Sequence, residues 1–156
     1  MNNANARLFL SQSTLFEGAS NFIIEEFLSR AQPIRFVVGE IPVAEATVTD
    51  RILMVTEGEL KIAVELQAPD QELKFLNAVP GTFLGLVNFF GEASQPCTAT
   101  ALTDVQAIAW RAEDWHELAK ANPAFGYQLA QRVGRELVQR MSTWINNLLN
   151  HVSWGV

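Results

Sequence analysis

The amino-acid sequence predicts a mainly β domain with helices on both sides of it. From residue 34 to 111 the chain is rich in Val, Ile, Leu and Phe, broken at intervals by Gly, Pro and Asp. Before and after this stretch, apolar residues recur at spacings of three and four, which is typical of amphipathic helices. The 156 residues suit one core better than two, so we expect residues 1–156 to form a single domain.

The N-terminal helical part is expected at residues 13–31. One face collects the apolar side chains of this segment, with an interruption near Gly18. These side chains are Leu15, Phe16, Ala19, Phe22, Ile23, Phe27 and Leu28.

The β part is expected at residues 34–111. In its clearest strand Leu60, Ile62 and Val64 alternate with polar residues, the period of a strand with one buried face. Turn residues at 69–70 and 80–81 divide further strands, and the segment 98–110 adds two more. The resulting seven or eight short strands match a small jelly roll, also called a double-stranded β-helix.

The C-terminal helices are expected at residues 113–152. A short helix is followed by Asn122 and Pro123, which suit the N-cap and the first position of a long helix. About 30 residues of helix span roughly 45 Å, which exceeds the width of a small barrel, so we expect part of this helix to pair with a second copy. Packing against the chain's own barrel is the alternative. The expected dimer interface is Leu129, Val133, Leu137, Met141, Trp144 and Leu148.

The composition and the net charge exclude several classes of function. The net charge of −6 opposes binding to nucleic acid or to anionic membranes, and no apolar run is long enough to span a bilayer. The single Cys97 and the lack of a secretory signal favour a cytoplasmic location. His116 and His151 have no nucleophile or metal-ligand partner at a suitable spacing, so we expect neither an enzyme nor a metal or cofactor site.

Several segments, in order, are similar to the cyclic-nucleotide-binding domains of the catabolite activator (Crp/Fnr) type. They are LFEGAS at 15–20, GEIPVAEATVTDRILMVTEGELKI at 39–62, Pro80-Gly81, Gly85, Thr98-Ala99, the stretch from Ala101 to Trp110, and Asn122-Pro123. The resemblance covers residues 13–145 and implies the jelly-roll fold, a dimer through the long helix, and a ligand-sensing role.

The family's phosphate-binding cassette is altered in this chain. The resemblance assigns a ribose-binding Glu to the position of Leu86 and a phosphate-binding Arg to that of Cys97, and both are replaced. Losing two charge-assisted contacts of roughly 1.5–3 kcal/mol each lowers affinity by about two to three orders of magnitude. An alternative register, starting from Gly91, restores a Phe-Gly-Glu triplet but no Arg. The ligand positions that the resemblance implies are Gly85, Leu86, Val87, Asn88, Cys97, Thr98 and Ala99, with Ser142 and Thr143 on the long helix.

Three functions therefore remain open. The domain binds a small effector other than cyclic AMP, or it is an effector-independent dimerisation and protein-interaction module, or it binds cyclic AMP or cyclic GMP unconventionally. Because the sequence ends soon after the long helix and carries no basic recognition helix there, we expect it to act through a protein partner and not on DNA.

Overall fold

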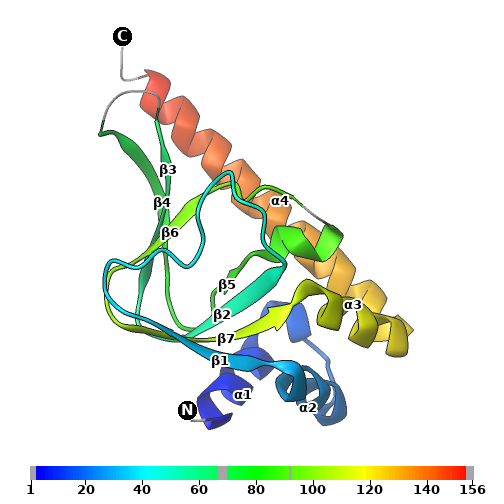
Figure 1. The fold of residues 1–156 in the computed structure, drawn as a ribbon. Coiled ribbons are helices and arrows are strands. Elements are labelled where there is room, and N and C mark those ends of the chain that lie inside the picture. Colours follow the sequence, from blue (N-terminus) through cyan, green and yellow to red (C-terminus); the bar gives the residue numbers. More distant parts are fainter. Residues whose placement is uncertain (1–2, 67–69, 92, 154–156) are drawn as a thin grey trace.

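The computed structural model describes residues 3–66, 70–91 and 93–153, which form a β-roll flanked by helices (Figure 1). The mainly β fold with a long C-terminal helix that the sequence predicts is confirmed. The helices before the roll are α1 (Asn3–Gln12), the 3-10 turn η1 (Thr14–Phe16) and α2 (Asn21–Arg30). Those after it are α3 (Ala112–Ala121) and α4 (Pro123–Ser153).

Two antiparallel sheets make up the roll. One has the strand order β1-β7-β2-β5 and the other β4-β3-β6. The strands are β1 (Gln32–Phe36), β2 (Arg51–Glu57), β3 (Leu60–Glu65), β4 (Glu72–Ala78), β5 (Phe83–Leu84), β6 (Thr98–Ala101) and β7 (Val105–Arg111). These strands lie inside the segment that the apolar pattern predicts, apart from the first two residues of β1.

Strand β3 departs in one detail from the predicted alternation. Leu60 and Ile62 are buried as expected. The pairing with β4 shifts between Ile62 and Ala63, so Ala63 is also buried and Val64 is only half-buried. A bulge of this kind reverses the facing of the residues that follow it, which a period of two cannot anticipate.

The core has two parts. An aromatic cluster joins the helices to the first sheet, and Phe16 contacts both Phe27 and Trp115, with ring centroids 4.9 and 5.7 Å apart. A second, aliphatic cluster fills the inside of the roll and includes Val55, Leu60 and Ile62. The helices α1, α2 and α3 therefore pack against the first sheet. The interior of the roll faces the later turns of α4.

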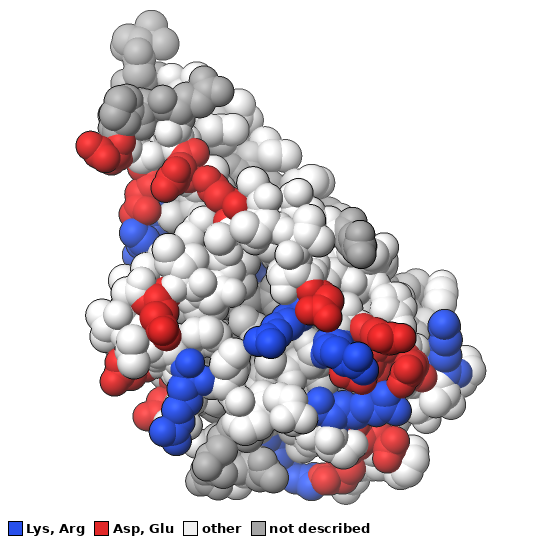
Figure 2. All heavy atoms as spheres, viewed as in Figure 1, with Lys and Arg blue, Asp and Glu red and all other residues white. Residues whose placement is uncertain are grey.

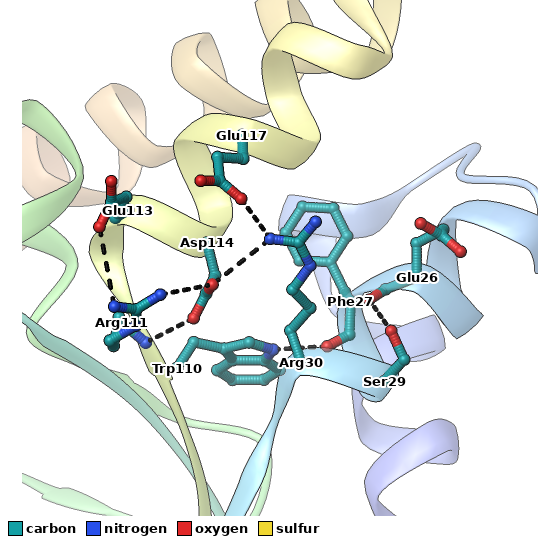
Figure 3. Close-up of polar contacts among 9 residues, drawn as sticks. All are labelled: Glu26, Phe27, Ser29, Arg30, Trp110, Arg111, Glu113, Asp114 and Glu117. Atoms are coloured by element: carbon teal, nitrogen blue, oxygen red, sulfur yellow. Dashed lines mark hydrogen bonds and ion pairs between the residues drawn. The ribbon is translucent and has the colours of Figure 1, made fainter.

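A polar network fixes α3 against α2 and β7 (Figure 3). The buried Trp110 donates its indole N–H to the backbone oxygen of Phe27 at 2.7 Å. Asp114 accepts from the backbone N–H of Arg111 at 3.3 Å and also pairs with Arg30, which contacts Glu117 as well. This carboxylate thus caps the start of α3 and links three elements.

Helix α4 runs along the whole roll (Figure 1). It begins at Pro123 as predicted, directly after Asn122, whose backbone oxygen accepts the N–H of Gly126 at 2.8 Å. Its first turns are inside the chain's own core, because Phe125, Leu129 and Val133 are buried there. Two of the residues expected at a dimer interface, Leu129 and Val133, are therefore unavailable to a partner, and that part of the prediction is wrong.

The N-terminal region contains one more helix than expected. Helix α2 and the 3-10 turn η1 lie within the predicted range 13–31. Helix α1 lies outside that range, and it buries Ala6 and Leu10 against the aromatic cluster. The segment is rich in Asn and its apolar face is short, so tertiary packing stabilises this helix more than its own propensity does.

Charged side chains are mixed on the surface. On the face drawn in Figure 2, basic groups lie close to acidic ones, and the region of α2 and α3 carries both. Among the described residues, no helix combines the length and the apolar character that a membrane span needs.

Candidate functional site

A small cavity lies between the roll and the side of α4 that faces it. Its free volume is about 40 Å³, enough for a few water molecules at most. Strands of the second sheet, the turn after β5 and α4 all contribute to its walls. The lining residues are Val43, Ile62, Leu76, Thr82, Leu84, Gly85, Leu86, Val87, Gln95, Pro96, Cys97, Ala99, Leu137, Arg140 and Trp144.

The turn at Gly85 shapes one wall of this cavity. Gly85 has φ +77 and precedes a short 3-10 helix, η2 (Leu86–Phe90). A Cβ on Gly85 would collide with the backbone oxygen of Arg51, so the close approach of this turn to β2 requires glycine. Gly91 ends the same helix and is exposed. The cavity is therefore bordered by the segment that begins at Gly85, and not by the segment of the alternative register that begins at Gly91.

Five of the predicted ligand positions line the cavity. Three follow each other at the turn, and two lie at the opposite side near β6. They are Gly85, Leu86, Val87, Cys97 and Ala99.

Asn88 has a structural role in place of the predicted ligand contact. It is 3% exposed and does not line the cavity. Its side-chain amide donates to the backbone oxygen of Arg51 at 2.9 Å and its amide oxygen accepts from Gln95 at 3.1 Å. These bonds hold η2 to β2, since a buried amide needs its hydrogen-bond partners.

Three further predicted positions lie outside the cavity lining. The hydroxyl of Thr98 accepts the backbone N–H of Glu45 at 3.1 Å. Ser142 and Thr143 are exposed on α4, and Thr143 donates to the backbone oxygen of Gln139 at 3.1 Å. Those α4 hydroxyls do not face the cavity, because residues 137, 140 and 144 occupy the facing side of the helix.

The two positions that the resemblance assigns to charged anchors are uncharged here. Leu86 is 1% exposed and belongs to the hydrophobic core. Burial raises the pKa of the Cys97 thiol to about 11, and the nearby positive charge of Arg140 offsets only part of that effect. The thiol is therefore neutral at pH 7, and neither position offers a cation or an acidic acceptor to a ligand.

Helix α4 supplies a cation to the cavity wall instead. The side chain of Arg140 is 18% exposed, and its Nε donates to Oε1 of Glu136 at 2.9 Å. Leu137 and Trp144 line the same cavity, so the three residues share one side of the helix. Arg140 is not among the ligand positions predicted from the sequence, although it lies three residues after Leu137 and four before Trp144, which is the spacing of one helix face.

Trp144 packs within its own chain. Its ring stacks on Phe75 of β4, with centroids 5.2 Å apart. Trp144 and Leu137, which is partly buried against the core, were both expected at a dimer interface, and both lie against the roll instead. Of the expected interface residues, Met141 and Leu148 are exposed.

The histidines and acidic residues form no metal site among the described residues, where no group of three potential ligands lies together. His116 stacks on Phe89, with ring centroids 5.0 Å apart and an interplanar angle of 6°. His151 is exposed near the end of α4.

One family model and one curated relative match most of the chain. The family model of the cyclic nucleotide-binding domain matches residues 33–122. A CRP-like cAMP-activated global transcriptional regulator of Mycobacterium tuberculosis is 26% identical over 140 residues, covering 89% of this chain and 60% of the regulator. The chain thus spans about 60% of the length of that relative.

Two solved structures share the fold. The N-terminal domain of a transcriptional regulator from Streptomyces coelicolor superposes with a TM-score of 0.73 at 23% identity, covering 87% of this chain and 94% of that one. The catabolite activator protein of Thermus thermophilus gives a TM-score of 0.73 at 22% identity, covering 88% of this chain and 63% of that one.

Proposed function

Because this chain belongs to the cyclic nucleotide-binding domain family, we propose that it is a regulatory domain that binds a small effector other than cyclic AMP. The regulatory role is supported by the related Mycobacterium tuberculosis protein, which is a transcriptional regulator. One observation carries the choice of effector: the cavity beside η2 keeps the family's glycine turn, while Leu86 and Cys97 replace both charged anchors.

An apolar effector suits this cavity better than a nucleotide does. The walls are mostly aliphatic, and Leu84 and Leu86 are buried at the turn. A cyclic phosphate placed beside Cys97 would face a neutral thiol, and a ribose beside Leu86 would lose hydrogen bonds to water without replacement. Desolvation therefore counts against the nucleotide and in favour of a ligand with an apolar body.

Helix α4 couples the cavity to an outer surface. Leu137, Arg140 and Trp144 form the helical wall of the cavity. A free volume of about 40 Å³ is smaller than an organic effector, so ligand entry has to move this wall away from the roll. Movement of a rigid helix changes the position of both its faces together, and the ligand shifts the equilibrium between the two positions by its difference in affinity for them.

The outer face of α4 is the proposed dimer surface. Five of its apolar side chains are 44–62% exposed, namely Val138, Met141, Ile145, Leu148 and Val152. Their alternating spacing of three and four residues is that of a heptad seam, which two copies of the helix bury against each other. This seam keeps Met141 and Leu148 from the original interface prediction and replaces the four residues that face the chain's own core or cavity.

Thermal unfolding with a ligand panel tests the effector site. The purified protein is melted with millimolar cyclic AMP, cyclic GMP, ATP, 2-oxoglutarate and small apolar acids, amides and alcohols. A ligand at about 100 times its Kd stabilises the folded state by about 2.7 kcal/mol, which raises the Tm of a chain of this length by roughly 5–10 °C.

Two variants at one position locate the binding. Cys97→Leu fills the cavity and removes the shift, whereas Cys97→Ser keeps the size of the side chain and preserves it. A shift that survives in folded Cys97→Leu protein places the ligand elsewhere and contradicts the proposal. A selective response to a cyclic nucleotide also contradicts it and favours the unconventional nucleotide sensor.

The alternative function is an effector-independent dimerisation and interaction module. The small volume of the cavity favours this alternative, because a packed interior needs no ligand to be stable. It predicts no thermal shift with any compound, together with a dimer whose dissociation constant is the same with and without the panel.

A further inference from the structure

The inner face of α4 places two side chains that carry hydrogen-bond donors beside an otherwise uncharged cavity. Arg140 and Trp144 are four residues apart, so they lie one above the other on the same side of the helix. Both line the cavity, and Arg140 carries the one formal charge among its described lining residues.

These donors are incompletely used. Within the described part of the chain, Arg140 is hydrogen-bonded through Nε to Glu136, and its two terminal amino groups have no protein partner. The indole Nε1 of Trp144 is buried, likewise without a partner among the described residues. A guanidinium and an indole N–H only donate, so an acceptor is the group that satisfies both.

The effector chemistry follows from this arrangement, and the inference rests on the function proposed above. We propose that the effector is a small apolar monocarboxylate whose carboxylate binds the terminal amino groups of Arg140 and the indole N–H of Trp144, with its hydrocarbon body against Ile62, Leu76 and Leu84. A planar guanidinium fits a carboxylate with two parallel hydrogen bonds. One cation at one end of an apolar chamber matches one charge at one end of the ligand.

Glu136 competes with the ligand for the same cation. It lies one helical turn before Arg140, and the two side chains are 32% and 18% exposed. An incoming carboxylate binds the terminal amino groups of Arg140 beside Glu136, or it displaces Glu136 from the guanidinium. In either case the negative charge of Glu136 repels the ligand, and removing that charge strengthens binding.

A second hollow gives the ligand room. It has a volume of about 230 Å³ and is lined by residues of η1, the turn at Gly81 and α4. Thr82, Leu86 and Arg140 line both spaces and so form the wall between them. A movement of Arg140 toward a ligand takes one of these three side chains out of the wall, and the neutral Cys97 thiol adds no opposing charge.

Isothermal titration of the whole chain tests the inference. The probes are octanoate, octanamide as its neutral analogue of equal length, and cyclic AMP. We expect octanoate to bind at least 10-fold more tightly than octanamide. Arg140→Gln reduces octanoate affinity about 10- to 100-fold, which is the loss of one charge-assisted contact. It reduces octanamide affinity much less, because a neutral amide oxygen accepts only a weaker hydrogen bond. Glu136→Gln increases octanoate affinity several-fold.

The contrary outcomes separate this inference from the proposed function. Equal affinities for octanoate and octanamide, both lost in Cys97→Leu, overturn the carboxylate inference while the effector site stands. Octanoate binding that changes in neither Arg140→Gln nor Glu136→Gln also overturns the carboxylate inference while the effector site stands. Failure of every probe to bind wild-type protein, together with an unresponsive ligand panel, overturns both.

Discussion

Replacing Ile145 by Ala should weaken the proposed dimer without weakening the fold. Ile145 is 49% exposed on the outer face of α4, so about half of its side chain is still accessible to a partner. Complete burial of such a side chain contributes about 2 kcal/mol, and the remaining half therefore contributes about 1 kcal/mol in each copy. A symmetric interface contains Ile145 twice, which gives about 2 kcal/mol and a roughly 30-fold increase in the dimer Kd.

Sedimentation equilibrium or light scattering over a concentration series measures that constant. Phe22→Ala is the matched control, because Phe22 is 63% exposed on α2 and lies away from the proposed seam. The Tm of the Ile145 variant, extrapolated to the monomer, should equal that of the wild type. A change in Kd of less than about threefold, or an equal change in the Phe22 variant, would refute the reasoning, as would a wild-type protein that stays monomeric.

Three further predictions concern the turn at Gly85, the Asp114 cap of α3 and the Cys97 thiol. Gly85→Ala should lower the free energy of unfolding by at least about 1–2 kcal/mol in a denaturant titration, because alanine is strained at φ +77 and its Cβ collides with the Arg51 backbone oxygen. Gly134→Ala is the control on a helix with room for a Cβ, and it should raise the free energy of unfolding by up to about 1 kcal/mol. Asp114→Ala should lower Tm by roughly 3–6 °C through loss of the α3 cap, a cost of about 1–2 kcal/mol, whereas Glu113→Ala changes little. Cys97 should react slowly with iodoacetamide at pH 8. The folded chain also keeps the thiol proton that the unfolded chain loses, so stability should fall as pH rises from about 9 to about 11, and Cys97→Ser should remove that slope.

Much of the fold is readable from local patterns. Leu60 and Ile62 follow a period of two and are buried in β3, and Pro123 begins α4 as its fixed φ predicts. Such features depend on neighbouring residues alone. Helix α1 could not be predicted because Ala6 and Leu10 form too short an apolar face, and one of its packing partners, β2, lies far away in the sequence.

The site was only partly predictable for a similar reason. Asn88 was expected to contact a ligand, but its partner is the backbone of Arg51, 37 residues away, and that pairing exists only once β2 and η2 are packed. In the sequence, the apolar residues of α4 read as one stripe. In the structure this stripe divides after Leu137, with Trp144 against the roll and Met141 and Leu148 outside. Helical spacing gives the faces of a helix, whereas the rotation that decides which face meets the roll is set by tertiary packing.

The most direct test of the effector site is the indole N–H signal of Trp144 in a nitrogen–proton correlation spectrum, assigned with Trp144→Phe, during a titration with octanoate. The Trp110 indole, which already donates to Phe27, is the internal reference. We expect a saturable downfield shift of the Trp144 signal, a stationary Trp110 signal, and no response in Cys97→Leu. A Trp144 signal that stays in place while the thermal panel or calorimetry reports binding would contradict this expectation.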